Sequence, residues 1–220
     1  MSFDILKYMS KNKDLKLVQE DGEALEHIKN QTLEICLEAV RNSGLALQYV
    51  KKQTPEICLE SVRHDGLSLK FVKKQTPEIC AEAVKNDYSA LQYVENQTYD
   101  LCLETVKNYG YALQYVDKQT DELCLEAVKD NGEALEYVKK QTLEICIEAI
   151  KETSYALKHV QNQTPELCLL AIENKRFFIN EVSLLEYILI VPKEYKTSVE
   201  QCISYLKSMI IKKDAIMKQL

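Results

Sequence analysis

The chain has 220 residues, of which 46% are hydrophobic and 28% are charged, so its composition excludes a disordered protein and indicates a folded one. Its formal net charge of -6 at pH 7 argues against a general nucleic-acid binder, because such proteins are usually strongly basic. The longest apolar stretch, residues 177–191, is interrupted by Asn180, Glu181 and Glu186 and is too short and too polar to span a bilayer.

The N-terminal segment, residues 1–20, precedes the recognisable repeats and is expected to form cap helices that seal the array. It begins Met1-Ser2-Phe3-Asp4 and lacks the basic and apolar regions of a secretory signal. We therefore expect a soluble cytoplasmic protein without a membrane partner.

Residues 21–174 form a tandem repeat with a period of 22 residues, marked by the dipeptide Gln-Thr. A fixed period of this length is typical of solenoids, in which one supersecondary unit is stacked many times. With the glutamine as position 1, the seven copies begin at Gln31, Gln53, Gln75, Gln97, Gln119, Gln141 and Gln163.

Each copy starts with the signals of a helix N-terminus. In the second copy, Thr54 is a preferred N-cap residue and Pro55 suits the first helical turn. Glu56 favours the positive end of the helix dipole, and Arg63 at position 11 favours the negative end. The pattern predicts a first helix that begins at position 3 in every copy.

Glycine marks the end of this first helix. We expect position 14 to adopt the left-handed conformation that terminates a helix, which glycine adopts without strain. Tyr88 and Ser154 occupy this position in two copies, where we expect a tighter or differently closed turn. The glycines at position 14 are Gly22, Gly44, Gly66, Gly110 and Gly132.

A second helix is predicted by the pattern Ala-Leu-x-Tyr-Val, as in residues 46–50. On a helical period, positions 16, 17, 19 and 20 form one apolar face, and positions 15 and 18 face outward. Helices this short are marginal alone, so each copy must be stabilised by its neighbours. We predict an all-α fold, an α-solenoid of seven 22-residue helix-turn-helix repeats with helical caps at both ends.

Residues 175–220 are expected to form the C-terminal cap. Pro192 breaks the chain, and residues 197–200, Thr-Ser-Val-Glu, have the form of a capping box at the start of a helix. A last amphipathic helix is predicted after it. Its apolar face contains Val199, Cys202, Ile203, Leu206, Met209 and Ile210.

The unit Gln-Thr-Pro-Glu-Ile-Cys-Leu-Glu-Ala-Val-Lys-x-x-Gly-x-Ala-Leu-x-Tyr-Val resembles the repeat called domain of unknown function 4116 over residues 21–174. That family occurs in multiple copies in proteins of giant DNA viruses and some microbes. The resemblance implies a helical repeat without an assigned activity, in a viral protein made in the host cytoplasm. It implies no catalytic residues.

Cysteine stands at position 6 in all seven copies and also at Cys202. Metal sites use clustered pairs such as Cys-x-x-Cys, and no such pair occurs here, so we expect reduced thiols packed in the core. The glutamine at position 1 is expected to bond the backbone of the neighbouring unit, because an amide both donates and accepts.

An aromatic ladder runs along position 19. We favour packing of these rings, and a stacking surface for bases or peptide stays open as the alternative. The members are Tyr49, Phe71, Tyr93, Tyr115 and Tyr137, with His27 and His159 in the same register.

Charges divide between the two predicted helices. Acidic residues at position 8 and lysine pairs at positions 21 and 22 predict an acidic edge and a basic edge. We interpret both as solvated surface with pairs three residues apart, such as Glu38 with Arg41 and Glu82 with Lys85. The lysine pairs are Lys51-Lys52, Lys73-Lys74 and Lys139-Lys140.

The sequence contains no phosphate-binding loop, metal motif or nucleophile elbow, so we predict no enzyme and no catalytic, cofactor-binding or metal-binding residue. The leading hypothesis is a scaffold that binds a protein partner along the exposed side of the second helices. Positions 15 and 18 vary between copies, and variation on a constant frame is where specificity would lie. The candidates are Leu45, Gln48, Leu67, Lys70, Ser89, Gln92, Tyr111, Gln114, Glu133, Glu136, Tyr155 and Lys158.

Two alternatives stay open. Nucleic acid would bind along the ridge of lysines and aromatic rings, although the net charge argues against it. Self-association would use the apolar surface of the C-terminal cap. Its candidate residues are Phe177, Phe178, Leu184, Leu185 and Ile188.

Overall fold

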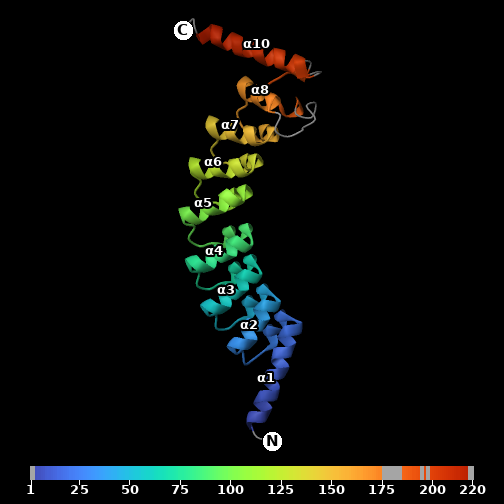
Figure 1. Cartoon of the computed structure of the whole chain (residues 1–220), viewed down its shortest axis with the longest axis vertical. Coiled ribbons are helices and arrows are strands. Elements are labelled where there is room, and N and C mark those ends of the chain that lie inside the picture. Colours follow the sequence, from blue (N-terminus) through green and yellow to red (C-terminus); the bar gives the residue numbers. More distant parts are fainter. Residues whose placement is uncertain (1–2, 175–184, 194–195, 197–198, 218–220) are drawn as a thin grey trace. The chain divides into compact units, whose positions relative to one another are not determined.

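The structure, a computed structural model, describes residues 3–174, 185–193, 196 and 199–217, with side chains described between residues 12 and 212 of those ranges (Figure 1). The regular elements of this part of the chain are all helical. None of the helices described there combines the length and apolar character needed to cross a lipid bilayer. The chain divides into two compact units, Met1–Leu101 and Cys102–Leu220.

The first unit alternates α-helices with short 3-10 helices, which are labelled η. Successive α-helices contact one another, and successive 3-10 helices do the same, so the unit has two layers (Figure 1). Its elements are α1 (Phe3–Glu20), η1 (Gly22–His27), α2 (Leu33–Asn42), η2 (Gly44–Tyr49), α3 (Pro55–His64), η3 (Gly66–Phe71), α4 (Pro77–Asn86) and η4 (Tyr88–Tyr93).

The second unit has the same two layers, and α5 contains the boundary between the units. The predicted α-solenoid of helix-turn-helix repeats is therefore confirmed in each unit. The remaining elements are α5 (Tyr99–Asn108), η5 (Gly110–Tyr115), α6 (Asp121–Asp130), η6 (Gly132–Tyr137), α7 (Leu143–Glu152), η7 (Ser154–His159), α8 (Pro165–Glu173) and α10 (Val199–Met217).

The α-helices begin where the sequence predicts. Thr54 Oγ1 accepts a hydrogen bond from the backbone N of Ile57 at 3.3 Å, and Pro55 occupies the first helical position. The position-2 threonine of every other copy makes the same bond at 3.2 or 3.3 Å. These bonds satisfy backbone donors that an isolated helix start leaves without partners.

The second helix differs from the prediction in type and in position. It is a 3-10 helix that starts at position 14, two residues before the Ala-Leu pattern, and ends at position 19. In the second copy Ser68 N donates to Asp65 O at 3.0 Å and Val72 N donates to Leu69 O at 3.0 Å. Bonds over three residues are typical of such short helical pieces.

The predicted role of glycine at position 14 is wrong. No residue of the described chain, glycine included, has a positive φ. A Cβ built on Gly66 would lie 2.4 Å from Ala83 O, and one built on Gly22 would lie 2.4 Å from Ala39 O. Glycine is needed because the backbone of the next α-helix comes too close for a side chain.

Position 14 of the sixth copy accommodates a serine side chain. Ser154 is buried, starts η7 as glycine starts the other 3-10 helices, and its hydroxyl donates to Asn174 O at 3.3 Å. The turn at Ser154 therefore differs little from the turns at glycine, because a 3-10 helix of the same length follows it.

The core of each repeat is built by the positions that carry the apolar period. In the second copy Ile57, Cys58 and Val62 come from the α-helix, and Leu69 and Val72 come from the 3-10 helix and the residue after it. All five are buried. Each helix pair therefore contributes one slice of a continuous core.

The repeat register continues beyond Asn174. Gln163 Nε2 donates to Tyr187 O at 2.7 Å, and Leu189 N donates to Gln163 Oε1 at 2.7 Å, as the position-1 glutamines do with the 3-10 helix of their own copies. Residues 185–188, Leu-Glu-Tyr-Ile, match the Leu-x-Tyr-Val part of the second-helix pattern. They occupy the second-helix place of the seventh copy, after a longer connection.

The predicted last helix is present as α10, which packs on α8. Cys202 and Leu206 are fully buried, while Ile203, Met209 and Ile210 are half-buried, in agreement with the predicted apolar face. The first two residues of the predicted capping box, Thr197 and Ser198, lie outside the described residues.

Replacing Gly66 by alanine tests the close-approach explanation. Because φ is already negative, alanine would stabilise the protein by reducing the freedom of the unfolded chain if space allowed. We expect instead a loss of about 1–3 kcal/mol in the free energy of unfolding, because the Cβ meets a backbone oxygen. Urea unfolding followed by circular dichroism gives this value. Ser154→Ala is the matched control, since position 14 already carries a Cβ there, and a Gly66→Ala variant as stable as wild type would contradict the explanation.

A buried serine pair in the second copy supports a second prediction. Ser61 Oγ lies 2.8 Å from Gly44 O and 2.7 Å from Ser68 Oγ, and both serines are fully buried where most copies have alanine. Ser61→Ala alone leaves the Ser68 hydroxyl without this partner, so we expect a loss of about 1–3 kcal/mol in unfolding free energy. Ser61→Ala/Ser68→Ala removes both groups and should recover most of that loss, as measured in a double-mutant cycle of urea unfolding.

Candidate functional site

The position-1 glutamines join the backbones of successive 3-10 helices. Gln53 Nε2 donates to Leu47 O in η2 at 3.4 Å and to Phe71 O in η3 at 2.8 Å. Its Oε1 accepts from Lys73 N at 2.9 Å. Gln31, Gln119, Gln141 and Gln163 repeat all three bonds. The predicted amide bonding between neighbouring repeats is confirmed, and the glutamines therefore have a structural role.

The cysteines at position 6 lie behind this amide row. Cys58 Sγ donates to Gln53 Oε1 at 3.8 Å, and all eight cysteines of the chain are buried thiols. Burial raises the pKa of Cys124 to about 11 and that of Cys168 to about 12, so both thiols stay protonated at neutral pH. The packing role predicted for them is confirmed. No group of three or more His, Cys, Asp or Glu side chains suited to a metal ion occurs among the described residues.

Asparagine at position 12 makes a second inter-repeat bridge that the sequence analysis missed. Asn86 Oδ1 accepts from Gly66 N at 2.7 Å, and Asn86 Nδ2 donates to Arg63 O at 2.8 Å. Asn42 bonds Gly22 N and Gln19 O in the same way. The signal was the recurrence of asparagine at this position in the first, third, fourth and seventh copies.

Ion pairs link successive α-helices as well as residues within one helix. Arg41 contacts Glu60 of the next copy at 2.6 Å and Glu38 of its own helix at 3.1 Å. Arg63 contacts Glu82 at 2.9 Å. The predicted pair of Glu38 with Arg41 is confirmed, and the pairs between copies were missed. These side chains are half-exposed, so their attraction is largely screened by solvent.

The aromatic side chains of position 19 pack between repeats where their contacts are resolved. Tyr137 meets Tyr111 edge to face, with ring centroids 6.0 Å apart, and Tyr187 meets Tyr155 in the same way at 6.1 Å. The position-19 residues of the first six copies are half-buried. This supports the predicted packing role and shows that a position-15 side chain can contact the ring of the next repeat.

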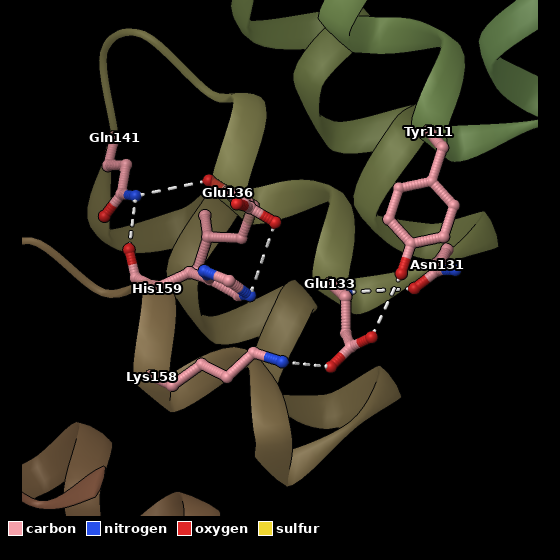
Figure 2. A network of polar contacts seen from close by, with 8 residues as sticks. Tyr111, Asn131, Glu133, Glu136, Gln141, Lys158 and His159 are labelled. Carbon is pink, nitrogen blue, oxygen red and sulfur yellow. Dashed lines mark hydrogen bonds and ion pairs between the residues drawn. The ribbon is translucent and has the colours of Figure 1, made fainter.

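A polar network crosses the 3-10 helices η5, η6 and η7 of the second unit (Figure 2). Tyr111 OH donates to Glu133 Oε2 at 3.0 Å, and Lys158 Nζ pairs with Glu133 Oε1 at 2.6 Å. The bond from Lys158 holds the pKa of the Glu133 carboxyl below its usual range. The network therefore connects three successive repeats through their variable positions.

His159 is the exception in this network. Its side chain is 16% exposed, and its Nε2 is buried without a hydrogen-bond partner, 3.9 Å from Glu136 Oε2 (Figure 2). Burial, with the neighbouring Lys158 charge, lowers the pKa of His159 below 6.5 despite the opposing effect of Glu136 and Glu133. The imidazole is therefore held neutral in a site where the first five copies place tyrosine or phenylalanine.

The structure separates the candidate residues into two classes. In the first six copies, which the structure describes at these positions, the residues at position 18 are exposed, as predicted, and those at position 15 are half-buried. Within each unit the 3-10 helices that carry them lie side by side, so the exposed residues form a row. The exposed class is Gln48, Lys70, Gln92, Gln114, Glu136 and Lys158, and the half-buried class is Leu45, Leu67, Ser89, Tyr111, Glu133 and Tyr155.

Two lysines of the predicted basic edge donate hydrogen bonds to backbone carbonyl oxygens of the preceding repeat. Lys51 Nζ donates to Ile28 O at 3.0 Å and to Lys29 O at 3.1 Å, at the end of η1. Lys139 Nζ makes the equivalent bonds to Val116 O and Asp117 O. These lysines bind carbonyl oxygens just after the C-terminal end of the preceding 3-10 helix, where a cation is favoured.

The apolar surface proposed for self-association needs a correction. Leu185 and Ile188 are buried in the second unit and cannot present a surface, and Phe177, Phe178 and Leu184 lie outside the described residues. The large apolar side chains exposed in this part of the described chain are Leu189 and Ile211, at 73% and 68%.

Comparison with known families identifies one match. The model of the family described as domain of unknown function (DUF4116) matches residues 54–98, 76–120, 98–142 and 120–164, which together cover half of the chain. Each match begins at a position-2 threonine and spans two copies of the repeat. No curated protein and no solved structure shows a significant match to the chain.

The buried histidine gives a prediction about pH. Because the pKa of His159 is lower in the folded than in the unfolded state, the folded state binds fewer protons, and stability is lost as pH falls below about 6.5. We expect His159→Tyr to reduce this acid-induced loss, measured as the difference in thermal midpoint between pH 7.5 and pH 5. His27→Tyr is the control, because His27 holds the same repeat position but is exposed. Equal pH dependence of His159→Tyr and wild type would reject the assignment.

Proposed function

The chain belongs to the family described as domain of unknown function (DUF4116), and on that premise we propose that it acts as a non-enzymatic scaffold for protein–protein interaction. The observation that carries the proposal is the row of position-18 side chains. They are exposed in each of the first six copies and vary among glutamine, lysine and glutamate, while the position-1 glutamines are bonded to the backbone of the 3-10 helices.

The burial of the cysteines and the bonding of the position-1 glutamines support a role without catalysis. The cysteines, which are the recurring residues most suited to act as nucleophiles, are buried in each unit, and the position-1 amides are bonded to backbone groups. The raised pKa of Cys124 and Cys168 makes their thiolates scarce. Residues that recur at one structural position support stacking, whereas a catalytic site needs different groups that converge.

The partner surface lies on the 3-10 layer of a unit. Its rows combine an exposed polar residue at position 18 with a half-buried side chain at position 15, which is leucine or tyrosine in four of the six copies, so a partner would meet both polar and apolar groups. Such a surface suits the extended interfaces of repeat proteins. The resemblance to repeats of giant DNA viruses extends the proposal to a scaffold that works in the cytoplasm of an infected host cell.

Nucleic acid is the weaker candidate. Stacking readers need accessible ring faces beside a positive groove, and here two of the described rings meet neighbouring rings edge to face. Lys51 and Lys139 are already bonded to carbonyl oxygens. A gel-shift experiment with a single-stranded oligonucleotide at low salt would favour this candidate if it showed a steep loss of binding with added salt.

The scaffold proposal predicts which side chains control partner capture. Replacing Gln48, Lys70 and Gln92 by alanine removes the exposed row of the first unit without touching its core. Affinity capture from the native cell, followed by mass spectrometry, should lose its specific partner with this variant, while helicity stays unchanged by circular dichroism. Position 18 is a sharper test than position 15, where Tyr111 and Tyr155 pack between repeats.

The matched control is Glu56→Ala/Glu78→Ala/Lys85→Ala, three equally exposed residues on α3 and α4 of the same unit. Capture by the control should equal that of the wild type. If both triple variants keep the same partners as wild type, or both lose them, the 3-10 layer is not the binding surface.

A further inference from the structure

A surface hollow lies between the connections that enter α2 and α3 in the first unit. Its volume is about 450 Å³, within the range of ligand pockets, and it is open to solvent. The connection before α2 forms one wall and the connection before α3 forms the other. The lining residues used below are Lys29, Leu33, Cys36, Lys51, Lys52 and Ile57.

The hollow is positively charged in a chain whose net charge is -6. Three lysines line it and no carboxylate does. Lys51 Nζ is held in place by the carbonyl oxygens of Ile28 and Lys29, which leaves one of its three N–H groups for another acceptor. Lys29 and Lys52 are exposed at the rim. The site therefore has one positioned cation and two adaptable ones.

The floor and one wall of the hollow are apolar. Cys36 and Ile57 are buried beneath it, and Leu33 is 48% exposed beside it. Position 3 holds proline in the second, third and seventh copies and leucine in the first and sixth, so leucine is not a general feature of the repeat. An apolar side chain entering the hollow would remove the exposed part of Leu33 from water.

We propose that this hollow binds an acidic peptide segment of a protein partner, with carboxylates placed against Lys29, Lys51 and Lys52 and one apolar side chain against Leu33. The combination decides the class of occupant. Three cations without a facing carboxylate favour an anionic group, and the apolar wall favours a segment with both carboxylates and an aliphatic side chain over a simple inorganic anion. The inference rests on the proposed function only in taking the partner to be a protein.

The test uses synthetic peptides and the full chain, so it does not depend on capturing a cellular partner. The probe is a peptide in which a central leucine is flanked by aspartate and glutamate, labelled with an uncharged dye, and binding is read by fluorescence anisotropy at low ionic strength. We expect saturable binding of this peptide and none of a peptide with lysine in place of each acid. Lys29→Glu/Lys52→Glu should weaken binding by about tenfold or more.

The next repeat provides a matched control. Lys73→Glu/Lys74→Glu makes the same charge change at positions 21 and 22 of the second copy, and neither residue lines the hollow. It should change the dissociation constant by no more than about twofold, because charges a repeat away are screened. Leu33→Pro, which copies the neighbouring repeats, should weaken binding by about fivefold, whereas Leu143→Pro at the same position in the sixth copy should not.

Several results would overturn the inference. These are equal weakening by the two lysine variants, no binding by wild type, and binding that is unaffected by Leu33→Pro. An oligonucleotide that binds more tightly than the peptide and loses affinity in Lys29→Glu/Lys52→Glu would assign the hollow to nucleic acid instead. A concentration-dependent dimer in sedimentation that this variant abolishes would assign it to a second copy of the chain. These binding and sedimentation measurements do not depend on the partner captured through position 18. The proposal for the hollow and the scaffold proposal can therefore be rejected independently of each other.

Discussion

The hydrogen bonds of the position-1 glutamines are the interaction on which the rest of each unit depends. A six-residue 3-10 helix has poor bond geometry and cannot persist alone. The amide of Gln53 ties the ends of η2 and η3 with three bonds to backbone groups, so each short helix is held by the glutamine before it. The core residues on these helices, such as Leu69, are placed by that tie. Without it the second layer would have no fixed spacing.

The sequence predicted most of the α layer because its signals are local. A threonine cap and an acidic first turn act within one helix end, and all seven copies agree. Glycine was misread for the opposite reason. Its requirement comes from the carbonyl oxygen of a residue one repeat later, such as Ala83 opposite Gly66, and that distance cannot be deduced from the glycine's own neighbours. The 3-10 form of the second helix was missed because an apolar face of six residues fits both helix types.

The accessibility of the candidate residues could be predicted from the sequence at position 18 but not at position 15. The alternation of constant and variable residues correctly placed position 18 on the outside. Position 15 reads as equally variable, yet Tyr111 and Tyr155 are drawn between repeats by the rings of Tyr137 and Tyr187. These contacts depend on the stacking offset of successive 3-10 helices, which no single copy encodes. The hollow beside Leu33 likewise combines residues of two successive copies, and the sequence shows only its lysines.

The glutamine and asparagine bridges have a property that side-chain pairs lack. Their partners are main-chain N–H and C=O groups, which almost every amino acid carries, so a bridge does not depend on which side chains the neighbouring copy has. As far as these bridges are concerned, any copy can therefore follow any other. A whole repeat could be gained or lost without a compensating change in the backbone partners of these bridges. That freedom lets the outward-facing row diverge from copy to copy while the stacking geometry is inherited intact.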